Sequence, residues 1–118
     1  MRKVFFLILT TTIYSCAQQI NNVVEDDNQF KVDSVFNYYI KVLDTYLVDT
    51  STDSSVRRVH MMHYLEGLTG IMSSGTVTYL GTFTYKRNDV KNWREWYSKN
   101  RKYLFWDARK KQIIYKKE

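Results

Sequence analysis

Two histidines and a glutamate recur at every third position near the middle of the chain, as His60, His63 and Glu66. Imidazole nitrogens and carboxylate oxygens are ligands of zinc, and a histidine can also act as a general base. Along a helix, the first and third members of this series lie about 120° apart around the axis. A metal would therefore need a further ligand from elsewhere. A hydrolase or metal-dependent enzyme that uses His60 or His63 is the lesser alternative to a helix flank that faces water.

The three tryptophans, Trp93, Trp96 and Trp106, form a second group that could bind a ligand. Exposed indole faces would make these residues candidate ligand-facing aromatics of a carbohydrate- or peptidoglycan-binding domain. The competing interpretation is that they fill the core of a small domain rich in aromatic residues. Basic residues are interleaved with them, which predicts a basic outer face. The candidate residues of this face are Arg94, Lys99, Arg101, Lys102, Arg109, Lys110 and Lys111.

Short motifs of common catalytic sites are missing from the sequence. It contains no G-x-S-x-G, no H-E-x-x-H and no glycine-rich phosphate loop. We therefore expect a protein without catalysis and without a cofactor.

The first sixteen residues have the order of an export signal. Arg2 and Lys3 precede the short apolar run 4–9, and small or apolar residues lead to Cys16. A spanning helix would need about 17–25 apolar residues. The order resembles a bacterial lipoprotein signal, in which the peptide is cut before the cysteine and the thiol is acylated, as with palmitate. The resemblance implies residues 1–15 as signal peptide and a mature chain anchored by lipid at Cys16. It places the protein in the cell envelope, on the extracytoplasmic side of the outer or plasma membrane.

A cut after Ala17 is the alternative, because Ser15 and Ala17 are small residues that suit ordinary signal peptidase. The product would be a soluble secreted domain. Cys16 is the only cysteine of the chain, and acylation would account for a lone thiol in an exported protein.

Charge is distributed unevenly along the chain. Residues 17–85 contain four basic and eight acidic side chains, a net charge of −4. Residues 86–118 contain twelve basic and four acidic side chains, a net charge of +8. This split predicts either two parts of a fold that attract each other or a basic face for an anionic partner. The simpler interpretation is a solvated basic surface. For an exported chain we expect anionic lipid head groups, acidic glycans or an envelope protein as partners, and no nucleic acid.

In the N-terminal half of the mature chain, polarity and apolar spacing predict a tether followed by helices. Residues 16–28 are polar and are interpreted as a lipidated flexible tether, and residues 29–118 as one small domain. Apolar spacing predicts a first helix that begins near residues 29–33. A second helix is expected over residues 54–68, with N-caps among residues 50–53 and a stop at glycine 70. The two helices should pack as a hairpin.

After residue 70 the spacing of the apolar residues changes from that of a helix to that of a strand. Alternation over residues 76–85 predicts a strand, in which Gly81 marks a bulge or a close approach. A third helix is expected over residues 90–102, capped by Asn88 or Asp89. Two short apolar runs follow, at residues 103–106 and 112–115, around a polar turn. The resulting fold class is α+β: an N-terminal helical hairpin, a strand, a third helix and a C-terminal β-hairpin that forms a small antiparallel sheet.

Two stretches together resemble a known module. Residues 64–70 read YLEGLTG, and residues 92–100 read NWREWYSKN. A helix that ends in Leu-Thr-Gly, a loop, and then Trp-x-x-Trp on a helix resembles the terminal module of bacterial HEAT-like repeat proteins, where it closes a helical array. The resemblance covers roughly residues 56–100. Here no repeat array precedes the module, and the strand-like segment lengthens the loop. The resemblance implies a structural or interaction module and carries over no catalytic residues.

These features together predict a small envelope lipoprotein that acts as a binding or scaffolding module. A carbohydrate-binding domain with exposed tryptophans and a soluble secreted domain are the two alternatives that stay open.

Overall fold

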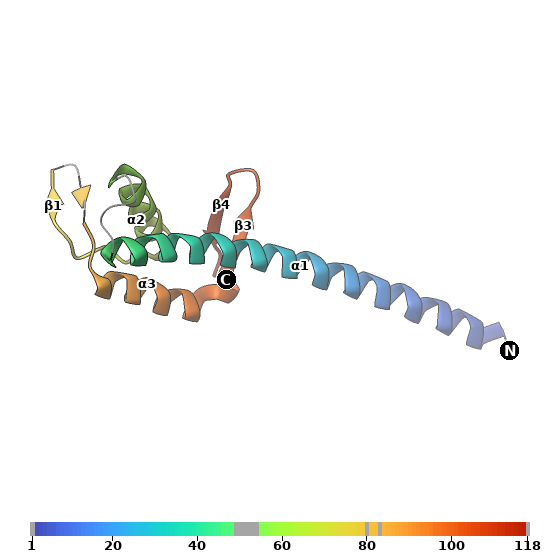
Figure 1. Cartoon of the computed structure of the whole chain (residues 1–118). Coiled ribbons are helices and arrows are strands. Elements are labelled where there is room, and N and C mark those ends of the chain that lie inside the picture. The colour runs from blue at the N-terminus through green and yellow to red at the C-terminus, as the bar shows by residue number, and fades with distance from the viewer. Residues whose placement is uncertain (1, 49–54, 80, 83, 118) are drawn as a thin grey trace.

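The computed structural model describes the backbone of residues 2–48, 55–79, 81–82 and 84–117, and the side chains of residues 24–47, 56–76, 79 and 84–117. It extends 77 × 30 × 25 Å along its principal axes. The length comes from helix α1 (Arg2–Val48), whose N-terminal half projects beyond the other elements (Figure 1). The described residues form three α-helices and two antiparallel strand pairs, so the predicted α+β class is confirmed.

Helix α1 supplies the central element of the core. Its buried residues recur at intervals of three or four, as Val32, Phe36, Ile40 and Leu43. The helix begins before the predicted region 29–33 and includes residues 24–28, which the sequence assigned to a flexible tether. The chain contains no proline, and its first glycine is at position 67. No strong helix breaker therefore separates the polar N-terminal segment from the apolar face.

Asn28 connects the segment assigned to the tether with the C-terminal sheet. Its Oδ1 accepts the backbone N–H of Trp106 at 3.1 Å, and its Nδ2 donates to the carbonyl of the same residue at 3.4 Å. The side-chain amide of Asn28 thus makes the hydrogen bonds that a neighbouring strand would otherwise make with the backbone of Trp106. Residue 28 consequently belongs to the folded domain.

Helix α2 (Ser55–Thr69) agrees with the prediction to within one residue at each end. Gly70 ends it in the left-handed region, at φ 71°, and donates its N–H to the carbonyl of Glu66 at 2.9 Å. The helix packs on α1, where the rings of Tyr39 and Tyr64 meet edge to face with centroids 5.0 Å apart. The N-caps expected among residues 50–53 lie outside the described residues.

The single strand predicted over residues 76–85 is wrong, because the chain reverses within it. Strand β1 (Val77–Thr78) pairs antiparallel with β2 (Gly81–Thr82), with Val77 opposite Thr82. Alternating threonines suit either arm of a hairpin as well as one long strand, so the sequence pattern could not separate the two. A close approach occurs at Gly75, where a Cβ would lie 1.9 Å from the carbonyl oxygen of Thr84. The surroundings of Gly81, where a bulge or close approach was expected, lie outside the described side chains.

Helix α3 (Arg87–Asn100) begins three residues before the predicted start. Its N-cap residue is Lys86. Asp89, at the third helical position, caps the backbone of that residue, because its Oδ2 accepts the N–H of Lys86 at 2.7 Å. The helix continues into a 3₁₀ turn (Arg101–Tyr103). Its Trp93 is fully buried in the core, beside the ring of Tyr85.

The predicted C-terminal hairpin is confirmed as β3 (Leu104–Asp107) and β4 (Gln112–Tyr115). Asp107 organises the turn between them, since its Oδ1 accepts the N–H groups of Arg109 and Lys110, both at 3.0 Å. This hairpin lies beside α1 at the end of the domain that faces the N-terminal half of that helix (Figure 1).

Candidate binding groove

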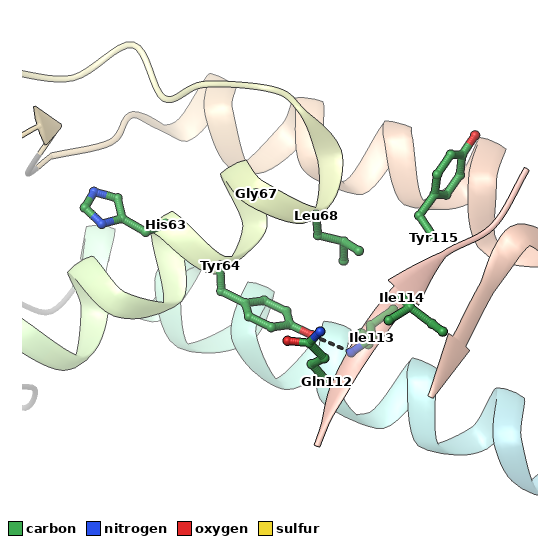
Figure 2. A pocket seen from close by; sticks show the side chains of 8 residues that line it. All are labelled: His63, Tyr64, Gly67, Leu68, Gln112, Ile113, Ile114 and Tyr115. Carbon is green, nitrogen blue, oxygen red and sulfur yellow. Dashed lines mark hydrogen bonds between the residues drawn. The ribbon is translucent and has the colours of Figure 1, made fainter. Parts of the chain in front are cut away.

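A groove of about 430 Å³ separates the C-terminal half of α2 from β4. One wall comes from α2 and the other from the strand, as Figure 2 shows. The lining residues are His63, Tyr64, Gly67, Leu68, Gln112, Ile113, Ile114 and Tyr115. Gly67 leaves its wall open, because no atom lies within 4 Å of the place that a Cβ would occupy.

Tyr64 bridges the two walls at one end of the groove. Its hydroxyl accepts the backbone N–H of Ile113 at 2.7 Å, and burial raises the pKa of this phenol. Ile113 pairs with Trp106 across the sheet, and the backbone of Trp106 is bonded outward to Asn28. The two residues therefore form a non-hydrogen-bonded pair, whose backbone groups point to the outer edges of the sheet.

Tyr115 lies at the other end of the groove. It stands two residues after Ile113, opposite Leu104, so the alternation of the ladder also turns its backbone N–H and C=O away from β3. Its ring packs beside that of Trp96, with centroids 5.6 Å apart, and its hydroxyl donates to Asn100 Oδ1 at 3.2 Å. The outer edge of β4 thus borders the groove.

The three residues first considered as metal ligands do not converge. His60 and His63 are exposed, whereas Glu66 is 6 % exposed. His63 Nε2 lies 4.0 Å from Glu66 Oε2. Over the described ranges, no three histidine, cysteine, aspartate or glutamate side chains are placed to hold a metal ion.

Glu66 instead holds the loop that follows α2. Its Oε1 accepts both the N–H and the hydroxyl of Ser73, at 2.9 and 2.6 Å. Asp89 does the same for Ser74 from the start of α3, with both distances 3.1 Å. These carboxylates satisfy backbone groups of an irregular segment. The sequence offered no indication of either pair, because the partners lie 7 and 15 residues apart in different elements.

The structure separates the three tryptophans by role. Trp93 has no exposed surface, and its indole N–H donates to the carbonyl of Ile71 at 3.0 Å. It therefore cannot face a ligand, which corrects its inclusion among the candidate aromatics. Trp96 and Trp106 are partly buried. Trp106 borders a second groove, of about 410 Å³, together with Val24, Asp27, Asn28, Lys31 and Ala108.

The candidate basic residues are all exposed, but two of them pair with acidic residues of α1. Arg94 Nη2 lies 3.2 Å from Asp44 Oδ2. Arg101 binds Asp33 through two nitrogens, and Tyr97 donates its hydroxyl to the same carboxylate. These contacts support the prediction that the oppositely charged parts of the chain attract each other.

The remaining basic side chains gather elsewhere on α3 and around the hairpin. Lys99 lines a small groove beside Trp96, and Lys102 lies near the ring of Tyr103. The others occupy the turn between β3 and β4, as Arg109, Lys110 and Lys111. Lys116 and Lys117 follow the end of β4 and are also exposed.

Comparison of the chain with protein families, with curated proteins and with solved structures finds no significant match. The resemblances to a lipoprotein signal and to a HEAT-like terminal module stay predictions. Cys16 falls within α1, outside the described side chains. Among the residues that the structure describes, no helical stretch combines the length and apolar character that a membrane span requires.

Proposed function

We propose that this chain is an envelope lipoprotein, anchored through acylated Cys16, whose domain is a non-catalytic binding module. The groove between α2 and β4 is its proposed binding surface. The anchor rests on the order of residues 1–16, and the binding role rests on the structure of the domain.

The single observation that carries the binding role is the composition of the groove. Its walls combine apolar side chains with one outer strand edge, features suited to contacts with a ligand's backbone and side chains. The buried carboxylates of Glu66 and Asp89, by contrast, are engaged with serines of the same domain. Their hydrogen bonds give them a structural role in the α2–α3 loop.

Helix α1 supports a fixed relation between anchor and domain. The same helix contains position 16 and, further along, the core residues Val32 and Phe36. Acylation at Cys16 would then hold the groove at a set distance from the membrane, about 1.5 Å for every helical residue between them.

Replacement of the cysteine tests the anchor. Cys16→Ser should prevent lipidation, change the size of the mature chain and move it from the membrane fraction to the soluble fraction. A globomycin-type inhibitor of lipoprotein processing should leave the precursor uncut. If size and membrane partitioning stay unchanged in both experiments, the lipoprotein proposal fails, and a secreted domain cut after Ala17 takes its place.

A carbohydrate-binding role is the second candidate, and the groove beside Trp106 favours it. A partly exposed indole lies there beside Asp27, Asn28 and Lys31, whose polar groups could bond sugar hydroxyls. Titration with soluble peptidoglycan fragments should change tryptophan fluorescence, and Trp106→Ala should remove the response. Phe30→Ala, at a residue 67 % exposed on α1, is the matched control. An unchanged response in Trp106→Ala would exclude this groove.

A further inference from the structure

We infer that the groove between α2 and β4 binds an extended acidic peptide, which adds to the outer edge of β4 as a further strand. This inference rests on the proposed function, because it names the ligand class of the same groove. Three observations lead to it: the availability of the strand edge, the space beside it and the charge around it.

The two outer edges of the C-terminal sheet differ in what covers them. On β3, the side chain of Asn28 occupies both backbone groups of Trp106. On β4, Tyr64 occupies the N–H of Ile113 alone, and the ladder turns the backbone of Tyr115 toward the groove. An incoming strand could therefore pair with Tyr115 and with the carbonyl of Ile113, as in other cases of strand addition.

The space beside β4 suits a single extended chain. Neighbouring strands lie about 4.8 Å apart, and the groove of about 430 Å³ runs along this edge. Gly67 lacks a side chain at the facing wall, and Leu68 offers an apolar surface next to it (Figure 2). Alternate side chains of the added strand would contact this wall.

Charge around the edge favours an acidic partner over a second copy of the chain. Lys110 and Lys111 precede β4, and Lys116 and Lys117 follow it, all with exposed side chains. Antiparallel pairing of two β4 edges would bring the lysines of one copy beside those of the other, which is unfavourable. Carboxylates at the ends of an added strand would be attracted to both pairs.

A labelled synthetic peptide tests the inference on the purified full-length chain. The probe is an acetylated peptide of about six residues that alternates glutamate with valine. Fluorescence anisotropy at low ionic strength should report binding. The same peptide with lysine in place of glutamate should not bind. Methylation of alternate backbone nitrogens should weaken binding by about tenfold, because it removes the donors of the added strand.

Two substitutions of Gly67 test the location. Gly67→Phe should fill the groove and weaken peptide binding by about tenfold, or ~1.4 kcal/mol, whereas Gly67→Ala should bind as the unsubstituted chain does. Circular dichroism confirms that both variants are folded. Lys116→Glu with Lys117→Glu, which leaves the groove open, should slow association by about tenfold and reduce its dependence on salt.

Several outcomes would overturn the inference. They are equal binding by a folded Gly67→Phe variant, equal binding by the methylated peptide, and the absence of binding to the unsubstituted chain. Self-association of the chain that Gly67→Phe abolishes would show a second copy to be the occupant. Because these titrations use purified protein, their failure leaves the Cys16→Ser fractionation result intact, and failure of anchoring leaves the titrations intact.

Discussion

Asp33 of α1 and Arg101, which follows α3, form a two-pronged ion pair across the domain. Arg101 Nε lies 2.8 Å from Oδ1 and Nη2 lies 2.5 Å from Oδ2. The contact with Arg101 lowers the pKa of Asp33 from 3.8 to about 2, and the hydroxyl of Tyr97 adds to the shift. Conversely, burial and the nearby carboxylate raise the pKa of Tyr97. The pair links the acidic and basic parts of the sequence.

This pair predicts a specific acid dependence of stability. The pKa of Asp33 is lower in the folded chain, so its contribution is fully present above the unfolded value of 3.8 and is lost as the pH falls toward 2. Asp33→Asn should lower the free energy of unfolding at neutral pH by about 1 kcal/mol, since Arg101 is 48 % exposed. It should also flatten the loss of stability between these two pH values.

Urea denaturation at a series of pH values measures both effects. Glu95→Gln is the control, because Glu95 pairs with Lys91 on an exposed helix face. Its effect should stay below about 0.5 kcal/mol. A variant Asp33→Asn with the unsubstituted acid dependence would show that other carboxylates govern it.

Replacement by alanine should change the stability of the domain in opposite directions at two glycines that lie three residues apart. Gly70 has φ 71°, a conformation that costs an alanine about 1–2 kcal/mol, so Gly70→Ala should destabilise the domain. Gly67 lies in α2 with open space around its Cα, so Gly67→Ala should stabilise it by about 0.5–1 kcal/mol. Thermal unfolding of the two variants side by side decides this. A shift of the same sign in both would contradict the assigned end of α2.

Trp93 should dominate the stability of the core among the tryptophans. Trp93→Ala removes a fully buried side chain and its hydrogen bond to Ile71, with an expected cost of about 3–5 kcal/mol. Trp106→Ala should cost clearly less, because its side chain is partly exposed and its bonds to Asn28 come from the backbone. Urea midpoints compare the two variants. Equal costs would mean that the indole of Trp93 packs less tightly than its burial indicates.

The basic turn of the C-terminal hairpin should direct the domain toward an anionic membrane. Ala108 of this turn shares a groove with Val24, the first residue of α1 whose side chain is described, so the turn lies beside the part of α1 that leads toward Cys16. Each basic residue near such a surface contributes about 1 kcal/mol. We expect the Cys16→Ser chain to co-sediment with anionic vesicles at low salt, and to dissociate at physiological salt.

Placement of the charge provides the control for this experiment. Neutralising Arg109, Lys110 and Lys111 should abolish vesicle binding. Neutralising Lys86, Arg87 and Lys91, near the opposite end of the domain (Figure 1), should leave it largely intact. Equal recovery with neutral and anionic vesicles would show that the charge split serves only contacts within the fold, such as that between Arg94 and Asp44.

Local patterns were sufficient to predict most elements. The apolar period located α2 and the C-terminal hairpin to within a residue or two, and Gly70 marked a helix end because only glycine accepts its conformation readily. The same patterns failed where two structures share one pattern. Alternating threonines suit one strand or two, and a polar stretch without helix breakers can be a tether or, as around Asn28, part of a helix.

The sequence by itself determined the fold class, the charge split and the elements that contribute to the groove. Only the tertiary structure decided which side chains meet. The bonds from Tyr64 to Ile113 and from Asn28 to Trp106 join residues 49 and 78 positions apart. No local period encodes such distances. These contacts form because packing of α1 and α2 against the hairpin leaves backbone groups at its edges, which partly buried polar side chains satisfy.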